Sequence, residues 1–290
     1  MKTKRLRELL NKPGIISTPG AYDVWSARLV EKAGFPAVYM TGYGAAVSVI
    51  GQPDIGLITM TEMAIHAKNI ASAVDIPLIA DADNGYGGVL NVIRTVQEYE
   101  RGGVAAIQLE DQVFPKRCGH MEGKELIPME EMVAKVRAAV HARKSEGLVI
   151  IARTDARAVN GFDDAVKRSL AYADAGADVI FFEAPQSVEE MREVAKTIST
   201  PLLANMVEKG KTPLLSKEEL EALGYKIVIY PASLLYAATK SVIKLLQSLK
   251  EDGSTENCLE EMVAFSEFYG MVGVPEAREL EKSFFATANC

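Results

Sequence analysis

The segment Lys116-Arg117-Cys118-Gly119-His120 places a thiol, two cations and an imidazole within five residues. Neighbouring positive charge favours thiolate over thiol, so Cys118 can serve as an acid, a base or a nucleophile at neutral pH. A solvated basic turn holding an ordinary cysteine has the same residue types. The segment follows an apolar run that ends in Glu110-Asp111, and other apolar runs also end in acids. Its chemistry therefore depends on what the fold brings beside it.

The composition predicts a globular protein of a reducing compartment. The chain has 290 residues, 48% hydrophobic and 24% charged, enough for one large α/β domain. Its net charge is −7 and its one basic cluster is residues 2–7, so we expect no nucleic-acid partner. No run of about 18 apolar residues and no signal peptide is visible, so we expect no membrane partner and a cytoplasmic location. Cys118, Cys258 and Cys290 fit neither a disulfide framework nor a zinc site.

A repeated pattern organises the chain: an amphipathic helix, a closing glycine and then a short apolar run. Gly34, Gly103, Gly176 and Gly224 are such glycines. The expected strands fall near residues 14–17, 37–41, 77–81, 105–110, 148–153, 178–183, 201–205 and 226–230. Continuous apolar runs are typical of parallel strands covered on both faces. Together with the intervening helices they predict a (β/α)8 TIM barrel.

An open, doubly wound sheet is the alternative fold. It requires a glycine-rich phosphate turn after an early strand, and Thr41-Gly42-Tyr43-Gly44 matches that turn only weakly. We therefore expect residues 1–290 to form a single barrel domain in which residues 235–290 are a helical extension. Helices are expected at 240–250, 256–269 and 275–285. This extension is too apolar to be free, so it should pack on the barrel or on another subunit.

Acids at successive strand ends suggest a metal site. In a TIM barrel the chemistry lies at the carboxyl ends of the strands. Asp81 and Asp83 follow the third expected strand, and Glu110 ends the fourth. These are hard oxygen ligands without a companion histidine, which favours Mg²⁺ or Mn²⁺ over zinc. Taken singly, each acid could instead be a helix cap or an ion-pair partner.

Arg153 ends the fifth expected strand and suits bidentate capture of a carboxylate. A structural ion pair with Glu183 or Asp155 is its alternative role, and the two roles are compatible. The substrate class that these residues favour is a small-molecule carboxylate.

Five segments give the chain a resemblance to the isocitrate lyase and phosphoenolpyruvate mutase superfamily over essentially its whole length. They are residues 81–87 (DADNGYG), 110–112 (EDQ), 116–120 (KRCGH), 153–156 (RTDA) and 205–208 (NMVE). KRCGH resembles the lyase form of the gating loop, since mutases lack the cysteine. The chain is most similar to the short bacterial branch, which includes 2-methylisocitrate lyase, 2,3-dimethylmalate lyase, oxaloacetate hydrolases and petal-death-type lyases.

The resemblance implies a swapped-helix barrel whose C-terminal helices are exchanged between subunits, usually in a homotetramer. It also implies cleavage of a 2-hydroxy acid into an oxo acid and a carboxylic acid, with Mg²⁺ as the cofactor. The metal would be held by Asp81 and Asp83, with Glu110 and Asp54 acting through water.

The resemblance further implies roles for the remaining site residues. Cys118, poised by Lys116, Arg117 and His120, would protonate the enediolate left on one product. The substrate would be held by Thr41, Gly42, Tyr43, Arg153, Glu183 and Asn205. Tyr39 is a candidate base for the hydroxyl by position only. The loop at residues 116–120 should close over the substrate and exclude water.

Two departures from the family pattern bear on the substrate. Gln108 stands where methylisocitrate and isocitrate lyases usually have histidine, and Val207 stands where they have a hydroxyl residue. That hydroxyl helps to hold the extra carboxylate of a succinate product, and an unpaired carboxylate costs a few kcal/mol. The sequence thus favours 2,3-dimethylmalate, cleaved to pyruvate and propionate, over 2-methylisocitrate, cleaved to pyruvate and succinate.

Two other functions stay open. Oxaloacetate decarboxylation or hydrolysis can occur on the same scaffold, although Cys118 argues against a decarboxylase or mutase, which needs no proton donor there. A barrel retained as a binding protein without catalysis is the second. An intact metal set, arginine and thiol argue against it.

Overall fold

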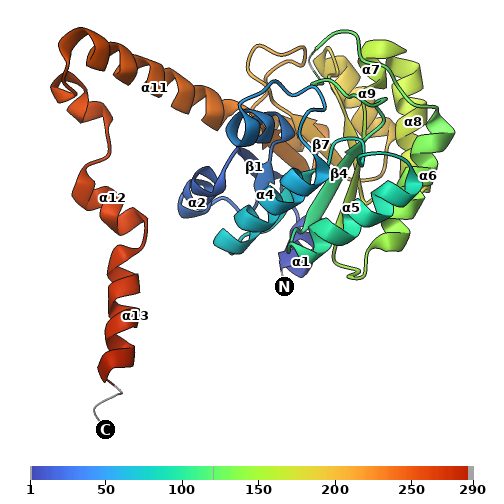
Figure 1. Cartoon of the computed structure of the whole chain (residues 1–290). Helices are drawn as coiled ribbons and strands as arrows, with labels where there is room; N and C mark the ends of the chain where they lie inside the picture. Colours follow the sequence, from blue (N-terminus) through green and yellow to red (C-terminus); the bar gives the residue numbers. More distant parts are fainter. Residues whose placement is uncertain (1, 120, 287–290) are drawn as a thin grey trace. The chain divides into compact units, whose positions relative to one another are not determined.

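The computed structural model describes residues 2–119 and 121–286, and the chain divides into two compact units, Met1–Tyr236 and Ala237–Cys290. The first unit is a closed barrel of eight parallel strands in sequence order, with β8 paired to β1 (Figure 1). The strands are β1 (Ile16–Ala21), β2 (Val38–Met40), β3 (Leu78–Asp81), β4 (Ala106–Glu110), β5 (Val149–Thr154), β6 (Val179–Phe182), β7 (Leu202–Asn205) and β8 (Ile227–Tyr230). This confirms the predicted (β/α)8 barrel and excludes the open sheet.

The first strand differs from its prediction. It was expected at residues 14–17 but spans Ile16–Ala21, and so includes Pro19 and Gly20. A Pro-Gly pair usually marks a turn. Here the backbone of Pro231 passes so close that a Cβ on Gly20 would lie 2.5 Å from the Pro231 Cα. The glycine is therefore required within the strand, by a neighbour more than 200 residues away in the chain.

Helices surround the barrel (Figure 1). They are α1 (Lys2–Asn11), α2 (Val24–Lys32), α3 (Gly42–Ala45), the π-helical turn η1 (Ala46–Ile50), α4 (Met60–Ala73), α5 (Val89–Arg101), α6 (Met129–Ala142), α7 (Ala156–Val159), α8 (Phe162–Asp174), α9 (Val188–Thr197) and α10 (Lys217–Leu223). The helix-closing glycines Gly34, Gly103, Gly176 and Gly224 have φ between 83° and 104°. Only glycine adopts this left-handed conformation without steric cost, which explains their regular spacing.

The strands bury side chains on both faces. On β5, Val149 and Ile151 lie in the cluster inside the barrel, while Ile150 and Ala152 belong to the cluster that packs against the helices. This explains why the runs are continuously apolar. Helix α1 inserts Leu6 into the interior cluster, and Arg7 holds α1 at the strand starts through Asp178 (2.7 Å). Because α1 covers the amino ends of the strands, the carboxyl ends form the accessible mouth.

The second unit is helical. Helix α11 (Ser233–Asp252) runs into it from the first unit, and η2 (Glu256–Glu261, a 3₁₀ helix), α12 (Phe265–Met271) and α13 (Val274–Ala286) follow. The helix expected at 256–269 is broken between η2 and α12. Large apolar side chains are exposed here: Leu246 is 58% accessible, Phe265 83% and Phe284 69%. In the single chain this apolar surface is uncovered.

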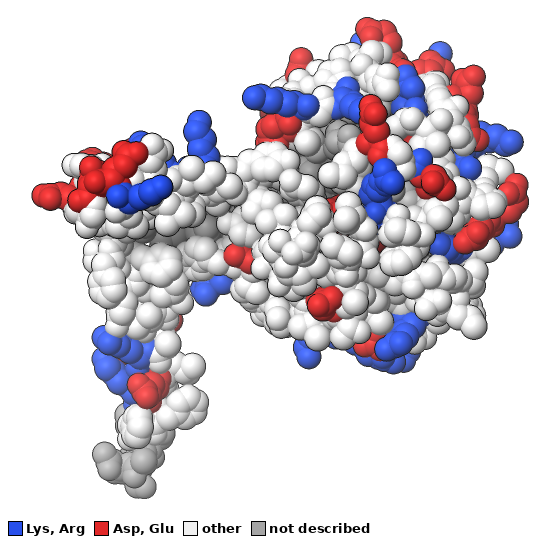
Figure 2. Space-filling model, turned by 45° about the horizontal axis from the view of Figure 1, so that its top comes forward, with Lys and Arg blue, Asp and Glu red and all other residues white. Residues whose placement is uncertain are grey.

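The charge distribution and the helix lengths can be compared with the sequence. On the face seen in Figure 2, basic and acidic side chains are interspersed and no continuous basic field is visible. A phosphate backbone requires such a field. Within residues 2–119 and 121–286, no helix combines the length and apolarity needed to span a bilayer.

Candidate active site

The sequence-predicted residues converge on one cavity at the carboxyl ends of the strands. It is lined by Tyr39, Thr41, Tyr43, Asp54, Asp81, Glu110, Lys116, Arg117, Cys118, Arg153, Glu183 and Asn205. Gly42 and Asp83 lie just behind this lining, since Gly42 donates to Asp81 and Asp83 pairs with Lys116. His120 lies outside the described residues. Parallel strands bring these positions together because all their carboxyl ends share one edge.

Lys116 lies among the acids predicted to hold a metal. Its Nζ is 2.5 Å from Oδ1 of Asp54 and 2.8 Å from Oδ1 of Asp83, and all three side chains are buried. Asp83 is directed there by a left-handed backbone (φ 47°), stabilised by its N–H donating to Oδ1 of Asp81 at 3.0 Å. Burial alone would lower the pKa of Lys116, but Asp83 and Asp54 raise it well above its usual value. The lysine is therefore a fixed positive charge in the site.

The predicted metal ligands are not preassembled. Among the described residues, no group of three or more histidine, cysteine, aspartate or glutamate side chains is arranged to hold a metal ion. Asp54, Asp81, Asp83 and Glu110 are buried, however, and burial raises the pKa of Asp83 to about 6 and that of Glu110 well above its usual value. Within the described part of the chain, Oε1 of Glu110 has no hydrogen-bond partner. These four acids face two cations, Lys116 and the guanidinium of Arg153, whose Nε lies 3.5 Å from Oε2 of Glu110. The acids outnumber the cations, so the donor set fits a divalent cation.

A second network occupies the β2–β4 side of the site. The Tyr39 hydroxyl donates to Oε1 of Gln108 at 2.8 Å, and Nε2 of Gln108 donates to Oδ1 of Asp81 at 3.3 Å. Gly42 N–H donates to Oδ2 of Asp81 at 3.2 Å. Burial, followed by the charge of Asp81, raises the pKa of Tyr39 well above its usual value. The protonated hydroxyl is unfavourable for the predicted role of Tyr39 as a base.

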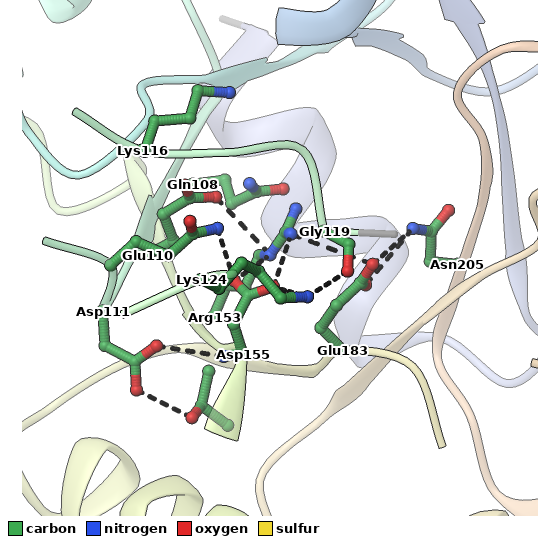
Figure 3. Close-up of polar contacts among 12 residues, drawn as sticks. Gln108, Glu110, Asp111, Lys116, Gly119, Lys124, Arg153, Asp155, Glu183 and Asn205 are labelled. Carbon is green, nitrogen blue, oxygen red and sulfur yellow. Dashed lines mark hydrogen bonds and ion pairs between the residues drawn. The ribbon is translucent and has the colours of Figure 1, made fainter. Parts of the chain in front are cut away.

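Arg153 makes both of the ion pairs considered as its structural role. Its Nε and NH2 donate to the two carboxylate oxygens of Asp155 at 3.0 Å each, and NH2 is 3.8 Å from Oε1 of Glu183. Glu183 also accepts from Nδ2 of Asn205 at 3.2 Å. Figure 3 shows Arg153, Asp155 and Lys124 pointing toward one another, with Lys116 apart from them. Arg153 is thus held rigidly at the cavity wall, where a carboxylate ligand can approach it.

The sequence reading missed the wall on the β8 side. Phe181, Val207, Ile229, Pro231, Ala232 and Tyr236 also line the cavity. Val207 was noted only for substrate choice. Tyr236 packs edge-on against Tyr43, with ring centroids 6.2 Å apart. The sequence signal for this wall is the end of the eighth strand, which is followed by Pro231.

Comparisons with known proteins agree with this geometry. The family model described as phosphoenolpyruvate phosphomutase matches residues 6–250. The chain is 52% identical over 280 residues to 2,3-dimethylmalate lyase from Eubacterium barkeri, covering 97% of each chain. It is 46% identical over 280 residues to 2-methylisocitrate lyase from Aeropyrum pernix, covering 96% of this chain and 90% of the relative.

Solved structures give the same result. A crystal structure of 2,3-dimethylmalate lyase, described as a PEP mutase/isocitrate lyase superfamily member, matches with TM-score 0.92 and 41% identity, covering 98% of this chain and 95% of that one. An oxaloacetate acetylhydrolase bound to 3,3-difluorooxalacetate matches with TM-score 0.93 and 37% identity, covering 97% and 96%.

The barrel with a buried acidic mouth and a cavity-lining thiol defines a class of enzymes acting on small carboxylates. The chain belongs to the PEP mutase/isocitrate lyase superfamily. The two relatives described above are named lyases, which confirms the prediction of a carbon–carbon lyase, and lyases of this superfamily are generally metal-dependent.

Lys116 should oppose cation binding at the acids that it pairs with. We predict that Lys116→Met raises the affinity of the metal-free protein for Mn²⁺ by tenfold or more, because a positive charge in contact with Asp54 and Asp83 is removed. The measurement is free Mn²⁺ by electron paramagnetic resonance during titration. Lys144→Met, at an exposed lysine, is the control and should leave the affinity unchanged. Equal or weaker binding by Lys116→Met would contradict the prediction.

Proposed function

We propose that the protein is a Mg²⁺-dependent lyase, with Mn²⁺ as a possible substitute, that cleaves 2,3-dimethylmalate into pyruvate and propionate. The observation that carries the proposal is the convergence of Cys118, Arg153 and the buried acids on one cavity. The similarity to 2,3-dimethylmalate lyase, at 52% identity over 97% of both chains, supports this substrate.

The reaction breaks C2–C3 of the substrate. The C2 hydroxyl loses its proton and becomes the carbonyl of pyruvate, and the bonding electron pair passes to the enediolate of the C3–C4 fragment. A proton delivered to C3 then completes propionate. Cys118, half-buried at the cavity wall, is the donor that we assign to this step. Arg117 and His120 are its predicted neighbours, and their cationic charge would favour the thiolate left after transfer.

The other residues bind and orient the substrate. Arg153, fixed by Asp155, would bind a substrate carboxylate together with Thr41 and Asn205. A divalent cation held by Asp81, Asp83, Asp54 and Glu110 would supply Lewis-acid stabilisation of the developing negative charge. The protonated Tyr39 suits a hydrogen-bond donor, as it is toward Gln108. As the base for the C2 hydroxyl, Tyr39 stays a candidate by position only.

The apolar wall supports a methyl group rather than a third carboxylate on the substrate. Val207, Ile229, Pro231 and Ala232 line the cavity together. A carboxylate placed against them would lose its hydration without gaining a donor. The methyl group at C3 of 2,3-dimethylmalate loses nothing by the same contact.

Purified protein with Mg²⁺ should release pyruvate from 2,3-dimethylmalate with a higher kcat/KM than from 2-methylisocitrate. Cys118→Ser should lower kcat by a factor on the order of a hundred or more, because a serine hydroxyl is a much weaker acid than a thiol. EDTA should abolish turnover and Mg²⁺ should restore it. Higher activity on 2-methylisocitrate would overturn the substrate assignment and leave the lyase assignment standing.

Val207→Ser should shift the preference toward 2-methylisocitrate. The hydroxyl supplies a donor for the additional carboxylate, so the ratio of kcat/KM for 2-methylisocitrate to that for 2,3-dimethylmalate should rise by roughly 10- to 100-fold. Val207→Ala enlarges the cavity without adding a donor and is the matched control. An equal shift in both variants would show that size, not hydrogen bonding, sets the preference.

Oxaloacetate hydrolysis is the second candidate, and the match to oxaloacetate acetylhydrolase at TM-score 0.93 favours it. It differs in its products, since oxaloacetate would give oxalate and acetate. Product analysis with oxaloacetate distinguishes it from the lyase reaction.

We also propose that the helices of the second unit are exchanged between subunits of a homotetramer, since their apolar side chains are exposed in the single chain. Phe265, which is 83% accessible, should be covered there. Phe265→Asp should therefore dissociate the assembly in sedimentation equilibrium, whereas Ser254→Asp, at an exposed polar position, should not. A wild-type monomer would refute the proposal. The cytoplasmic location stays a prediction from the sequence.

A further inference from the structure

The backbone of Arg117, the residue before Cys118, is held at two points by one side chain. Gln112 follows β4 and is 1% accessible. Its Oε1 accepts from the backbone N–H of Arg117 at 2.9 Å, and its Nε2 donates to the Arg117 carbonyl at 2.9 Å. A primary amide is suited to this contact because it donates and accepts in one plane. The contact fixes both the position and the orientation of this part of the loop.

The backbone of Gly119, the residue after Cys118, is held by a second side chain. Lys124, buried at 7% accessibility, donates from Nζ to the carbonyl of Gly119. The segment 117–119 is thus restrained on both sides of the thiol. Neither Gln112 nor Lys124 lines the cavity, so their part in the reaction must be indirect.

Both restraints end on the same carboxylate. Lys124 Nζ lies 3.1 Å from Oδ1 of Asp155, and Nε2 of Gln112 donates to Oδ2 of Asp155 at 3.2 Å. Asp155 also holds Arg153 in a bidentate pair. One buried anion therefore connects the loop to the arginine at the cavity wall (Figure 3).

The backbone of Asp155 is itself held by a hydrogen bond to the side chain of Asp111. Its backbone N–H donates to Oδ1 of Asp111 at 3.0 Å, and Oδ2 of Asp111 accepts from Thr154 at 2.7 Å and from Tyr172 at 2.8 Å. These groups belong to the barrel wall rather than to the loop. The position of the anchor therefore does not depend on the loop.

Gly119 shows how closely the restrained loop approaches the site. A Cβ at this position would lie 2.2 Å from NH2 of Arg153 and 2.4 Å from Oε1 of Glu183. Any larger residue would force the segment away from the Arg153–Glu183 pair. The restrained position is thus one in which the backbone beside Cys118 lies directly on the substrate-binding arginine.

We propose that Gln112 and Lys124 are positioning residues which, with Asp155 as their common anchor, hold residues 117–119 against Arg153 and so place the Cys118 thiol for proton transfer. We name Gln112, Lys124 and Asp155 the loop latch. The inference rests on the proposed role of Cys118, but the latch itself is measurable without substrate.

The test is the alkylation rate of Cys118 by iodoacetamide, followed by peptide mass spectrometry on the full-length protein without substrate. Gln112→Met keeps the side chain's size and neutral charge but removes both contacts to Arg117. We expect alkylation of Cys118 to accelerate on the order of tenfold. Gln186→Met is the matched control and should leave the rate unchanged. Gln186 is exposed, and its backbone N–H, which the substitution keeps, donates to Glu190.

Kinetics supply the second readout. In Gln112→Met, kcat should fall on the order of tenfold with a smaller change in KM, because Asp155 still holds Arg153 for substrate binding. Gly119→Ala displaces the same segment by another route, the clash of its Cβ with Arg153 and Glu183, and it should also accelerate alkylation. It keeps the proposal testable if Gln112→Met does not fold.

The outcomes separate the latch from the proposed reaction. Faster alkylation in a protein that cleaves none of the tested acids would support the latch and reject the proposed function. Wild-type alkylation rates in both Gln112→Met and Gly119→Ala would overturn the latch, whatever the enzyme's substrate.

Discussion

The catalytic mouth depends on one buried carboxylate, that of Asp155 at the end of β5. It accepts from Arg153, Lys124 and Gln112, which come from the barrel wall, the segment that follows residues 116–120 and the segment after β4. Burial alone would raise the pKa of Asp155, but Arg153 and Lys124 lower it to about 2. The carboxylate is therefore ionised at neutral pH. A neutral aspartic acid would remove the shared counter-ion of Lys124 and Arg153 and leave Arg153 only the longer contacts to Glu110 and Glu183.

The β3–β4 side of the mouth has the opposite balance of charge. Here four buried acids face the ammonium of Lys116 and, through Glu110, the edge of the Arg153 guanidinium. The pKa of Asp83 rises to about 6 because burial outweighs the attraction of Lys116. A site of this kind gains from a further cation, whereas the Asp155 side is already neutralised. The two halves thus suit the two ligands of the proposed reaction: a divalent cation on one side, and the carboxylate of a substrate near Arg153 on the other.

Substrate choice within this family depends on few positions because the barrel holds the rest constant. In the proposed reaction, the polar residues near Asp81 and Arg153 would bind a hydroxyl and a carboxylate that every proposed substrate shares. The remaining wall, formed by Val207, Ile229 and Pro231, would contact the part of the substrate that differs. A single donor added to or removed from an apolar wall changes selectivity more than a change in size does, because an unpaired buried carboxylate costs several times more than a lost methyl contact.

The sequence by itself determined the barrel and most of the cavity lining. Continuous apolar runs indicate strands that are buried on both faces. Closing glycines such as Gly103 and Gly176 indicate helix ends with a left-handed backbone. Both requirements are local, so the sequence alone predicts them. Because the carboxyl ends of the strands meet at one mouth, the sequence also predicts that the polar residues at or after these ends lie close together, among them Asp81, Glu110, Arg153 and Cys118.

Only the tertiary structure decided which charges pair. Lys116 was read as a neighbour of Cys118, yet its ammonium binds Asp54 and Asp83, and the anchoring role of Asp155 was considered only as an ion pair with Arg153. The strand containing Pro19-Gly20 and the place of Tyr236 in the site were likewise hidden, since both depend on the path taken after β8. Sequence spacing determines on which strand end or loop a residue lies. The partner of a long charged side chain depends instead on how loops from different strands pack together.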